Sequence, residues 1–94
     1  MAVRAKRAVE EALKQKGFRQ EENHHHFLVY WTADGLKTHI RTKTSHGSTK
    51  DLGDHLLSQM ARQVKLPKPQ FLSLIDCPMD RQTFEHTLRN DGSI

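Results

Sequence analysis

The fold of this chain is decided by residues 25–44, which read HHFLVYWTADGLKTHIRTKT. Residues 25–32 are rich in aromatic and β-branched side chains, which favours a strand. The Asp34-Gly35 pair that follows favours a tight hairpin turn. Residues 36–44 then alternate between apolar or threonine side chains and basic ones, a period typical of a strand with two unlike faces. We therefore expect an antiparallel hairpin with one apolar face and one basic face.

Amphipathic patterns on both sides of the hairpin predict helices. Before it, a helix should cover residues 5–16 because Gly17 is a natural stop, and a short strand should follow over residues 18–22. The apolar face of this first helix comprises Ala5, Ala8, Val9, Ala12 and Leu13. After the hairpin, the segment from Ser48 to Asp51 approximates a capping box for a second helix. The apolar positions of that helix are Leu52, Leu56, Met60 and Val64.

The C-terminal third carries signals for two further short helices. Pro67 and Pro69 end the second helix and start another through residue 75, because proline is accepted in a first helical turn but not in a helix interior. Met79 and Phe84 flank Asp80 with the spacing of a hydrophobic staple, which predicts a last helix that ends near residues 90–92. We expect a single domain over residues 1–94, with a core of about residues 3–65 and a helical extension over about 66–90.

The order of helix, three strands and helix defines the expected fold class. This α-β-β-β-α order matches the topology of double-stranded-RNA-binding domains, an α+β fold in which helices cover one face of a three-stranded antiparallel sheet. The two C-terminal helices would be additions to that layout. With 94 residues the core is small, so we expect an open surface site rather than an enclosed cofactor cavity.

Charge and composition narrow the classes of partner and location. The 15 Lys and Arg residues against 11 Asp and Glu residues give a net charge of +4, which suits a polyanion such as RNA. A single cysteine excludes an intrachain disulfide and a cysteine zinc cluster. No window approaches the roughly 18 apolar residues needed to cross a bilayer, and the N-terminus has no apolar leader. We therefore expect a cytoplasmic protein without a membrane partner.

The histidine run His24, His25 and His26 stands where the longer strand begins. Histidine exchanges protons near neutral pH and is also a common metal ligand, so this run is the first candidate for chemistry. Alternation along a strand would place His24 and His26 on one face and His25 on the other.

Several short motifs together resemble HicA, the small mRNA-interferase toxin of HicA–HicB toxin–antitoxin pairs. The resemblance spans about residues 5–76. It is carried by Lys16-Gly17-Phe18-Arg19, by the histidines that enter a strand, by Asp34-Gly35, and by Ser45-His46-Gly47 before a leucine-rich helix. It implies that His26 is the catalytic residue, with His25 as its neighbour, and that a HicB-like antitoxin is the protein partner. Three features depart from the family pattern: Asn23-His24 replaces its usual Gly-Ser, the hairpin after His26 is about two residues longer, and residues 66–90 extend beyond its compact form.

Metal-independent RNA cleavage needs a proton carrier and groups that stabilise the charge of the phosphorane. His26 would serve as the general base or acid, no cofactor would be required, and a 2′,3′-cyclic phosphate would result. The candidate RNA-binding residues lie in the histidine run, on the basic strand and before the second helix: His24, Lys37, His39, Arg41, Lys43, Ser45, His46 and Ser48.

Other interpretations of the same residues stay open at this stage. The basic residues of the second hairpin strand would also suit the solvated face of an antiparallel sheet. His24, His26 and His39, with Glu21 or Glu22, could ligate zinc, but no recognisable zinc spacing is complete and we predict no metal. A non-catalytic RNA-binding module would keep the fold and the basic face without cleaving RNA.

Overall fold

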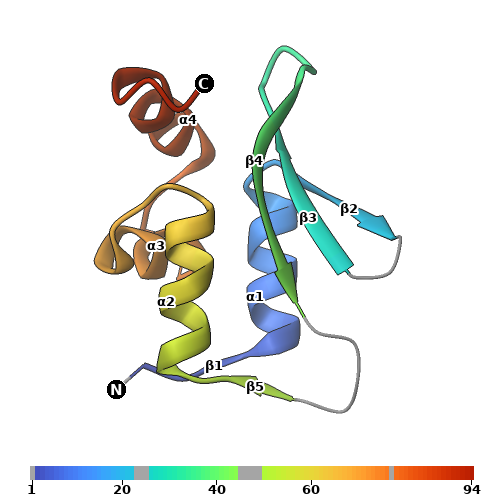
Figure 1. Cartoon of the computed structure of the whole chain (residues 1–94), viewed down its shortest axis with the longest axis vertical. Helices are drawn as coiled ribbons and strands as arrows, with labels where there is room; N and C mark the ends of the chain where they lie inside the picture. Colours follow the sequence, from blue (N-terminus) through green and yellow to red (C-terminus); the bar gives the residue numbers. More distant parts are fainter. Residues whose placement is uncertain (1, 23–25, 45–49, 77) are drawn as a thin grey trace.

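A three-stranded antiparallel sheet forms one layer of the molecule, in the order β2 (Phe18–Glu22), β3 (His26–Trp31) and β4 (Lys37–Thr44) (Figure 1). The computed structural model describes residues 2–22, 26–44, 50–76 and 78–94. The hairpin predicted from residues 25–44 is confirmed, and Gly35 in its turn has a φ of +85°, which favours glycine. The four basic residues of β4 are exposed and alternate with Ile40, Thr42 and Thr44, which are buried.

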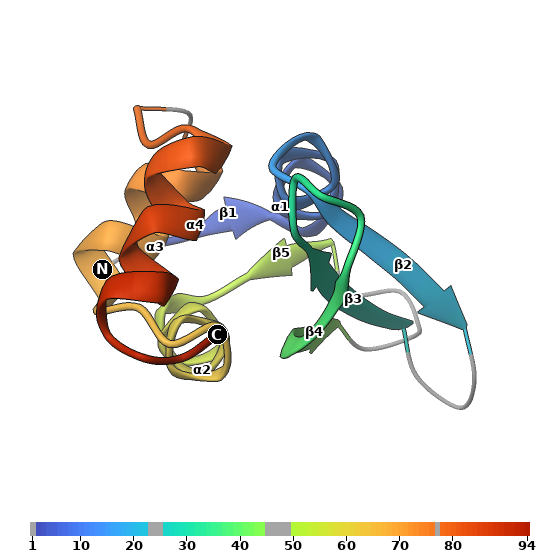
Figure 2. The same ribbon diagram turned by 90° about the horizontal axis from the view of Figure 1, so that it is seen from above.

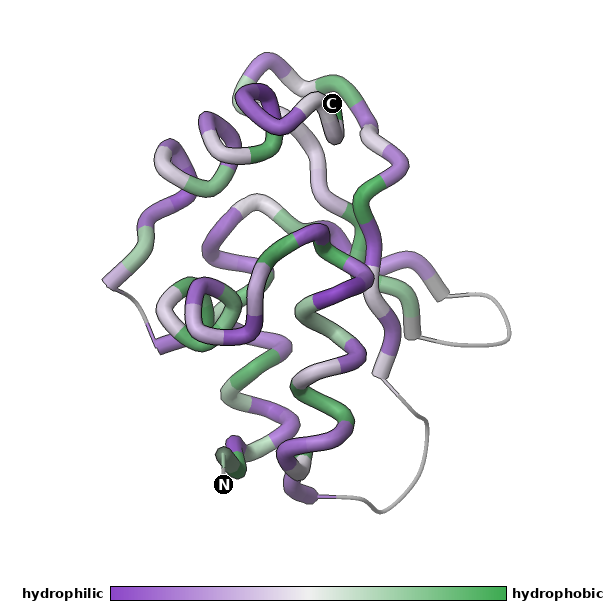
Figure 3. Tube along the Cα trace, turned by 60° about the vertical axis from the view of Figure 1, so that its left-hand side comes forward, coloured by the Kyte–Doolittle hydropathy of each residue, from purple (hydrophilic) through white to green (hydrophobic). Residues whose placement is uncertain are grey.

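Four helices cover one side of this sheet. They are α1 (Lys6–Gln15), α2 (Asp54–Gln63), α3 (Lys68–Ile75) and α4 (Arg81–Asn90). Figure 2 shows all four on the same side, and no helix of the described chain lies on the opposite side. Hydrophilic and hydrophobic residues alternate along the helices in Figure 3, as amphipathic helices require. The molecule is therefore a compact α+β domain in which one face of the sheet stays open.

A two-residue ladder that the sequence did not predict joins the segments that precede α1 and α2. β1 (Arg4–Ala5) pairs antiparallel with β5 (Asp51–Leu52). The prediction of a helix that opens in a capping box at residues 48–51 is therefore wrong, because α2 begins at Asp54 and Leu52 belongs to a strand.

The buried stripes of α1 and α2 also differ from the predicted ones. Ala5 and Ala8 are exposed, because β1 includes residue 5 and the packed stripe of α1 is limited to Val9, Ala12 and Leu13. On α2 the core takes Leu57 instead of Leu56, which is 40% exposed. Met60 and Val64 are buried as predicted.

The C-terminal helices complete the same core as the rest of the chain. Phe71 and Leu74 of α3 and Phe84 and Leu88 of α4 are fully buried, in one cluster with side chains of α1, α2 and the sheet. Phe84 packs with its ring centroid 5.6 Å from that of Phe18. Removing α3 and α4 would therefore expose apolar surface of α1 and the sheet to water.

Both C-terminal helices begin as their sequence signals predict. Pro69 stands in the first turn of α3, where its missing N–H removes no intrahelical hydrogen bond. Asp80 caps α4, because its carboxylate accepts a hydrogen bond from the Thr83 backbone N–H at 2.8 Å.

Polar contacts fasten α4 to the β3–β4 hairpin. The Glu85 carboxylate accepts hydrogen bonds from the Tyr30 hydroxyl at 2.6 Å and from the Ala33 N–H at 2.9 Å. The Arg81 guanidinium donates to the Trp31 carbonyl oxygen at 2.8 Å. Gly17 has a φ of +104°, and a Cβ at this position would stand 2.5 Å from Arg81 Nε. Glycine is therefore required at position 17. Helix α4 thus fixes the end of β3 that carries Trp31.

The stability of this contact should depend on pH. Burial, followed by the hydrogen bond to Glu85, raises the pKa of Tyr30 to about 12. A raised pKa means that Tyr30 contributes fully to the free energy of unfolding below about pH 10, and that this contribution is lost as the pH rises toward 12. We predict a loss on the order of 2 kcal/mol across that interval, measured by urea unfolding. Tyr30→Phe should decline less over the same interval, and an equal decline in both proteins would contradict the assignment.

Candidate nucleic-acid interface

The side of the sheet away from the helices is assembled by the strand register. Arg19, Val29 and Arg41 form one row across the three strands. Phe27 pairs with Lys43 two residues farther along the hairpin, on the same face. Residues that face one another across antiparallel strands project to the same face. We call this surface the open face, and it comprises Arg19, Glu21, Phe27, Val29, Trp31, Lys37, His39, Arg41 and Lys43.

Two arginines lie over aromatic rings on the open face. The Arg19 guanidinium carbon is 4.2 Å from the centroid of the Trp31 ring, and that of Arg41 is 5.0 Å from the Phe27 centroid. These cation–π contacts hold each planar cation in place, and its N–H fork can still bind an anion. Each pair places a flat stacking surface beside positive charge, which suits an unpaired nucleobase and its phosphate.

Positive charge exceeds negative charge on the open face. Its carboxylate, Glu21, forms an ion pair with Lys37 at 2.7 Å. Among the described residues, His39, Arg41 and Lys43 form no ion pair. Two shallow hollows of about 310 and 320 Å³ lie on this face, and Arg41 lines both of them. The open face can therefore accept an anionic, partly aromatic ligand such as a nucleic-acid strand.

The structure places the predicted site residues in two groups. Lys37, His39, Arg41 and Lys43 lie together on the exposed side of β4, as predicted. His26 begins β3, where its backbone is paired with Glu22 and Thr44, one row beyond the Phe27–Lys43 pair. Thr44 is buried on the helical side of the sheet, so this row does not belong to the open face. The remaining predicted residues lie outside the described residues: His24, His25, Ser45, His46 and Ser48.

The described residues contain neither a candidate metal cluster nor a helix that could cross a membrane. No group of three or more His, Cys, Asp or Glu residues that could hold a metal ion occurs within residues 2–22, 26–44, 50–76 and 78–94. His24, which belongs to the zinc alternative, falls outside those ranges. No helix among these residues is long and apolar enough to cross a membrane.

The three members of the open face that form its cation–π pairs with or beside Arg41, namely Arg19, Phe27 and Trp31, were missed by the sequence interpretation. Phe27 and Trp31 belong to a strand that is apolar on both faces, so its sequence shows no alternation that separates the core side from the open side. Arg19 could have been found, because it follows the buried Phe18 in β2 and alternation directs it outward.

Comparisons with family models, with curated proteins and with solved structures find no match to this chain.

Proposed function

We propose that this chain is a HicA-like ribonuclease that binds single-stranded mRNA on the open face and cleaves it with His26, without a metal ion. In this proposal the sheet with α1 and α2 is a double-stranded-RNA-binding-domain-like fold, to which α3 and α4 are added. The protein acts in the cytoplasm, and a HicB-like antitoxin inhibits it by covering the open face, where acidic groups of the partner would meet the unpaired cations.

The observation that carries the proposal is an uncovered sheet face on which cations stack on aromatic rings. A sheet face that is only solvated needs polar side chains, whereas the open face also carries two half-buried aromatic rings, Phe27 and Trp31, beneath cations. The stacked pairs Arg19–Trp31 and Arg41–Phe27 lie on neighbouring strands of this face. Such surfaces bind single-stranded nucleic acid by base stacking and phosphate contacts.

His26 is the proposed proton carrier, at the end of β3. Because its row lies outside the open face, the RNA strand would have to pass around this end of the sheet to reach it. As a general base it would take the proton of a ribose 2′-hydroxyl, whose oxygen attacks the adjacent phosphorus and displaces the 5′-oxygen. A protonated general acid would give its proton to the leaving oxygen. The products are a 2′,3′-cyclic phosphate and a 5′-hydroxyl. Arg41 and Lys43 would supply the positive charge that stabilises the phosphorane.

A non-catalytic RNA-binding module is the second candidate. It is favoured by the same stacked pairs, because cations and rings suffice to bind a strand and no proton transfer is involved. The two candidates differ in a single outcome, which is whether bound RNA is cleaved.

Binding of RNA to the open face is tested by removing both stacked arginines. We expect Arg19→Gln/Arg41→Gln to weaken binding of fluorescein-labelled single-stranded RNA by at least about 10-fold, because two base-stacking and phosphate sites are lost. Fluorescence anisotropy in EDTA measures this affinity without metal-dependent degradation.

The matched control removes two exposed cations of α1, on the helical side of the molecule. Arg7→Gln/Lys14→Gln changes the net charge by the same amount and should alter the affinity by less than about 3-fold at physiological salt. Equal losses in both double variants would show that overall charge, not the open face, binds RNA. Absence of binding by the unmodified protein would refute the proposed function.

A further inference from the structure

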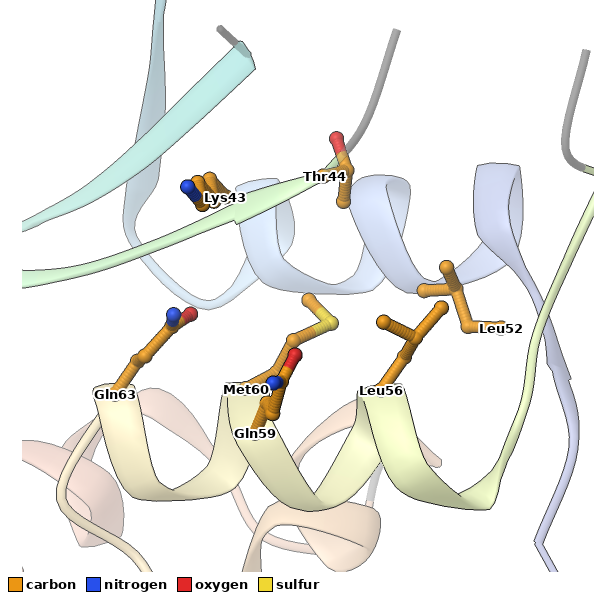
Figure 4. Close-up of a pocket in the computed structure, with 7 residues that line it drawn as sticks. All are labelled: Lys43, Thr44, Leu52, Leu56, Gln59, Met60 and Gln63. Carbon is orange, nitrogen blue, oxygen red and sulfur yellow. The ribbon is translucent and has the colours of Figure 1, made fainter. Parts of the chain in front are cut away.

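Positive charge continues from the open face around the edge of β4 and onto the end of α2. β4 is an edge strand of the three-stranded sheet. A hollow of about 580 Å³ beside it is lined by Lys43, Gln59, Arg62, Gln63 and Lys65. Lys43 and Gln63 also line the 320 Å³ hollow that contains Arg41, so the two hollows adjoin. Figure 4 shows Lys43 on β4 and Gln63 on α2 across the gap between these elements. We call Lys43, Arg62 and Lys65 the edge cluster.

The edge cluster has no carboxylate among the residues that line its hollow. Elsewhere some cations are neutralised, because Arg4 pairs with Asp76 at 2.7 Å and Arg89 pairs with Glu85 at 3.2 Å, whereas Arg7 and Lys14 on α1 form no ion pair among the described residues. Within the described part of the chain, no member of the edge cluster forms an ion pair. Cations that gather without counter-charge repel one another, and this repulsion is relieved when a polyanion binds.

Lys65 occupies a backbone position that favours glycine. Its φ is +66°, and it is the one non-glycine residue of the described chain in the left-handed region. It closes α2 in a Schellman arrangement, in which the Lys65 N–H donates to Arg62 O at 3.1 Å and the Leu66 N–H donates to Ala61 O at 2.9 Å. Glycine would make the same two hydrogen bonds with less strain. The backbone therefore does not require a lysine here, although a cation beside the C-terminus of α2 also favours the helix dipole.

The neighbouring groups suit a phosphate. Arg62 stands in the last turn of α2, where a cation also stabilises the helix dipole. The position of Arg62 alone is therefore not evidence of phosphate binding. The Gln63 amide oxygen accepts a hydrogen bond from the Thr42 hydroxyl at 2.5 Å, which leaves its NH₂ group as a donor. The hollow therefore offers three cations and at least one amide donor.

We propose that the edge cluster binds phosphates of the RNA strand as it leaves the open face and crosses the edge of β4. This inference rests on the proposed function, because it requires RNA on the open face. The bases would stack on the open face, and the phosphates that follow would meet Lys43, Arg62 and Lys65 without base specificity.

The test uses the whole chain and two fluorescein-labelled RNAs, a short one that fits on the open face and a longer one that reaches the edge cluster. Arg62→Gln/Lys65→Gln should weaken binding of the longer RNA by about 10-fold and lower the slope of log Kd against log salt by about 1.4, which is 0.7 for each lost phosphate contact. Binding of the short RNA should change by less than about 2-fold. Arg7→Gln/Lys14→Gln, which also removes a cation from the last turn of a helix, is the matched control.

Lys65→Gly supplies a variant in which stability and binding should change in opposite directions. Relief of the left-handed strain should raise the Tm by about 2–4 °C, while the affinity for the longer RNA falls by about 3-fold. A lower Tm would contradict the argument that glycine is favoured at this position.

The outcomes separate this inference from the proposed function. The edge-cluster inference is refuted if Arg62→Gln/Lys65→Gln binds the longer RNA as tightly as the control variant does. If Arg19→Gln/Arg41→Gln binds that RNA more weakly in the same assay, binding to the open face is still supported. Equal weakening of the short and the longer RNA would also overturn it, because the effect would then be general electrostatics. If the unmodified protein binds neither RNA, both proposals fail.

Discussion

Replacing His26 by alanine is expected to slow RNA cleavage by about 10²–10⁴-fold, because a positioned proton carrier contributes that factor to the rate. The affinity for single-stranded RNA should change by less than about 3-fold, because the proposed binding groups lie on the open face. The cleavage rate of labelled RNA is measured under single-turnover conditions in EDTA, at a protein concentration above the Kd of the protein–RNA complex.

The matched control for this substitution is His86→Ala, an exposed histidine of α4. The Tm of both variants should lie within a few degrees of that of the unmodified protein. A slower cleavage rate could then not be attributed to unfolding. Cleavage by His26→Ala at the unmodified rate would remove this residue from the mechanism. A parallel loss of binding and cleavage would instead assign His26 a role in binding.

Replacing Phe84 by alanine is expected to lower the free energy of unfolding by about 3–5 kcal/mol. Phe84 is fully buried, and its ring lies 5.6 Å from Phe18 and 5.0 Å from Tyr30 between ring centroids. The substitution removes these contacts and leaves a cavity where α4 meets the sheet. Because small domains have total stabilities of about 5–15 kcal/mol, the loss should be large enough to populate unfolded chains.

Urea unfolding followed by circular dichroism measures this loss. Leu36→Ala is the control, because Leu36 is a large apolar residue that is 65% exposed in the hairpin, and it should cost less than about 0.5 kcal/mol. A loss below about 1 kcal/mol for Phe84→Ala would show that α4 is loosely attached. It would also contradict the conclusion that α4 holds the end of β3 that carries Trp31 in place.

Much of the fold could be predicted because its signals are local. The alternation in β4, the turn at Asp34-Gly35 and the cap at Asp80 each depend on residues within one element. The exchange of Leu56 for Leu57 could not be predicted, because both leucines fit a helical stripe and tertiary packing selects one of them. The β1–β5 ladder was missed because strands of two residues carry no periodic signal.

The candidate site was only partly predictable for a similar reason. The basic residues of β4 follow from a period of two within one strand. The stacking of Arg19 on Trp31 and of Arg41 on Phe27 depends on the register between strands, which the sequence does not display. The edge cluster joins residues of β4 and α2, whose contact arises only when the helix packs beside the strand.

The most direct test of ribonuclease function identifies the ends of the cleaved RNA. Purified protein is incubated with mixed-sequence single-stranded RNA in excess EDTA, and the new termini are determined by mass spectrometry. We predict 2′,3′-cyclic phosphates paired with 5′-hydroxyls, formed by the unmodified protein and not by His26→Ala prepared in parallel. RNA that stays intact while anisotropy shows it to be bound would contradict this account and establish a non-catalytic RNA-binding module.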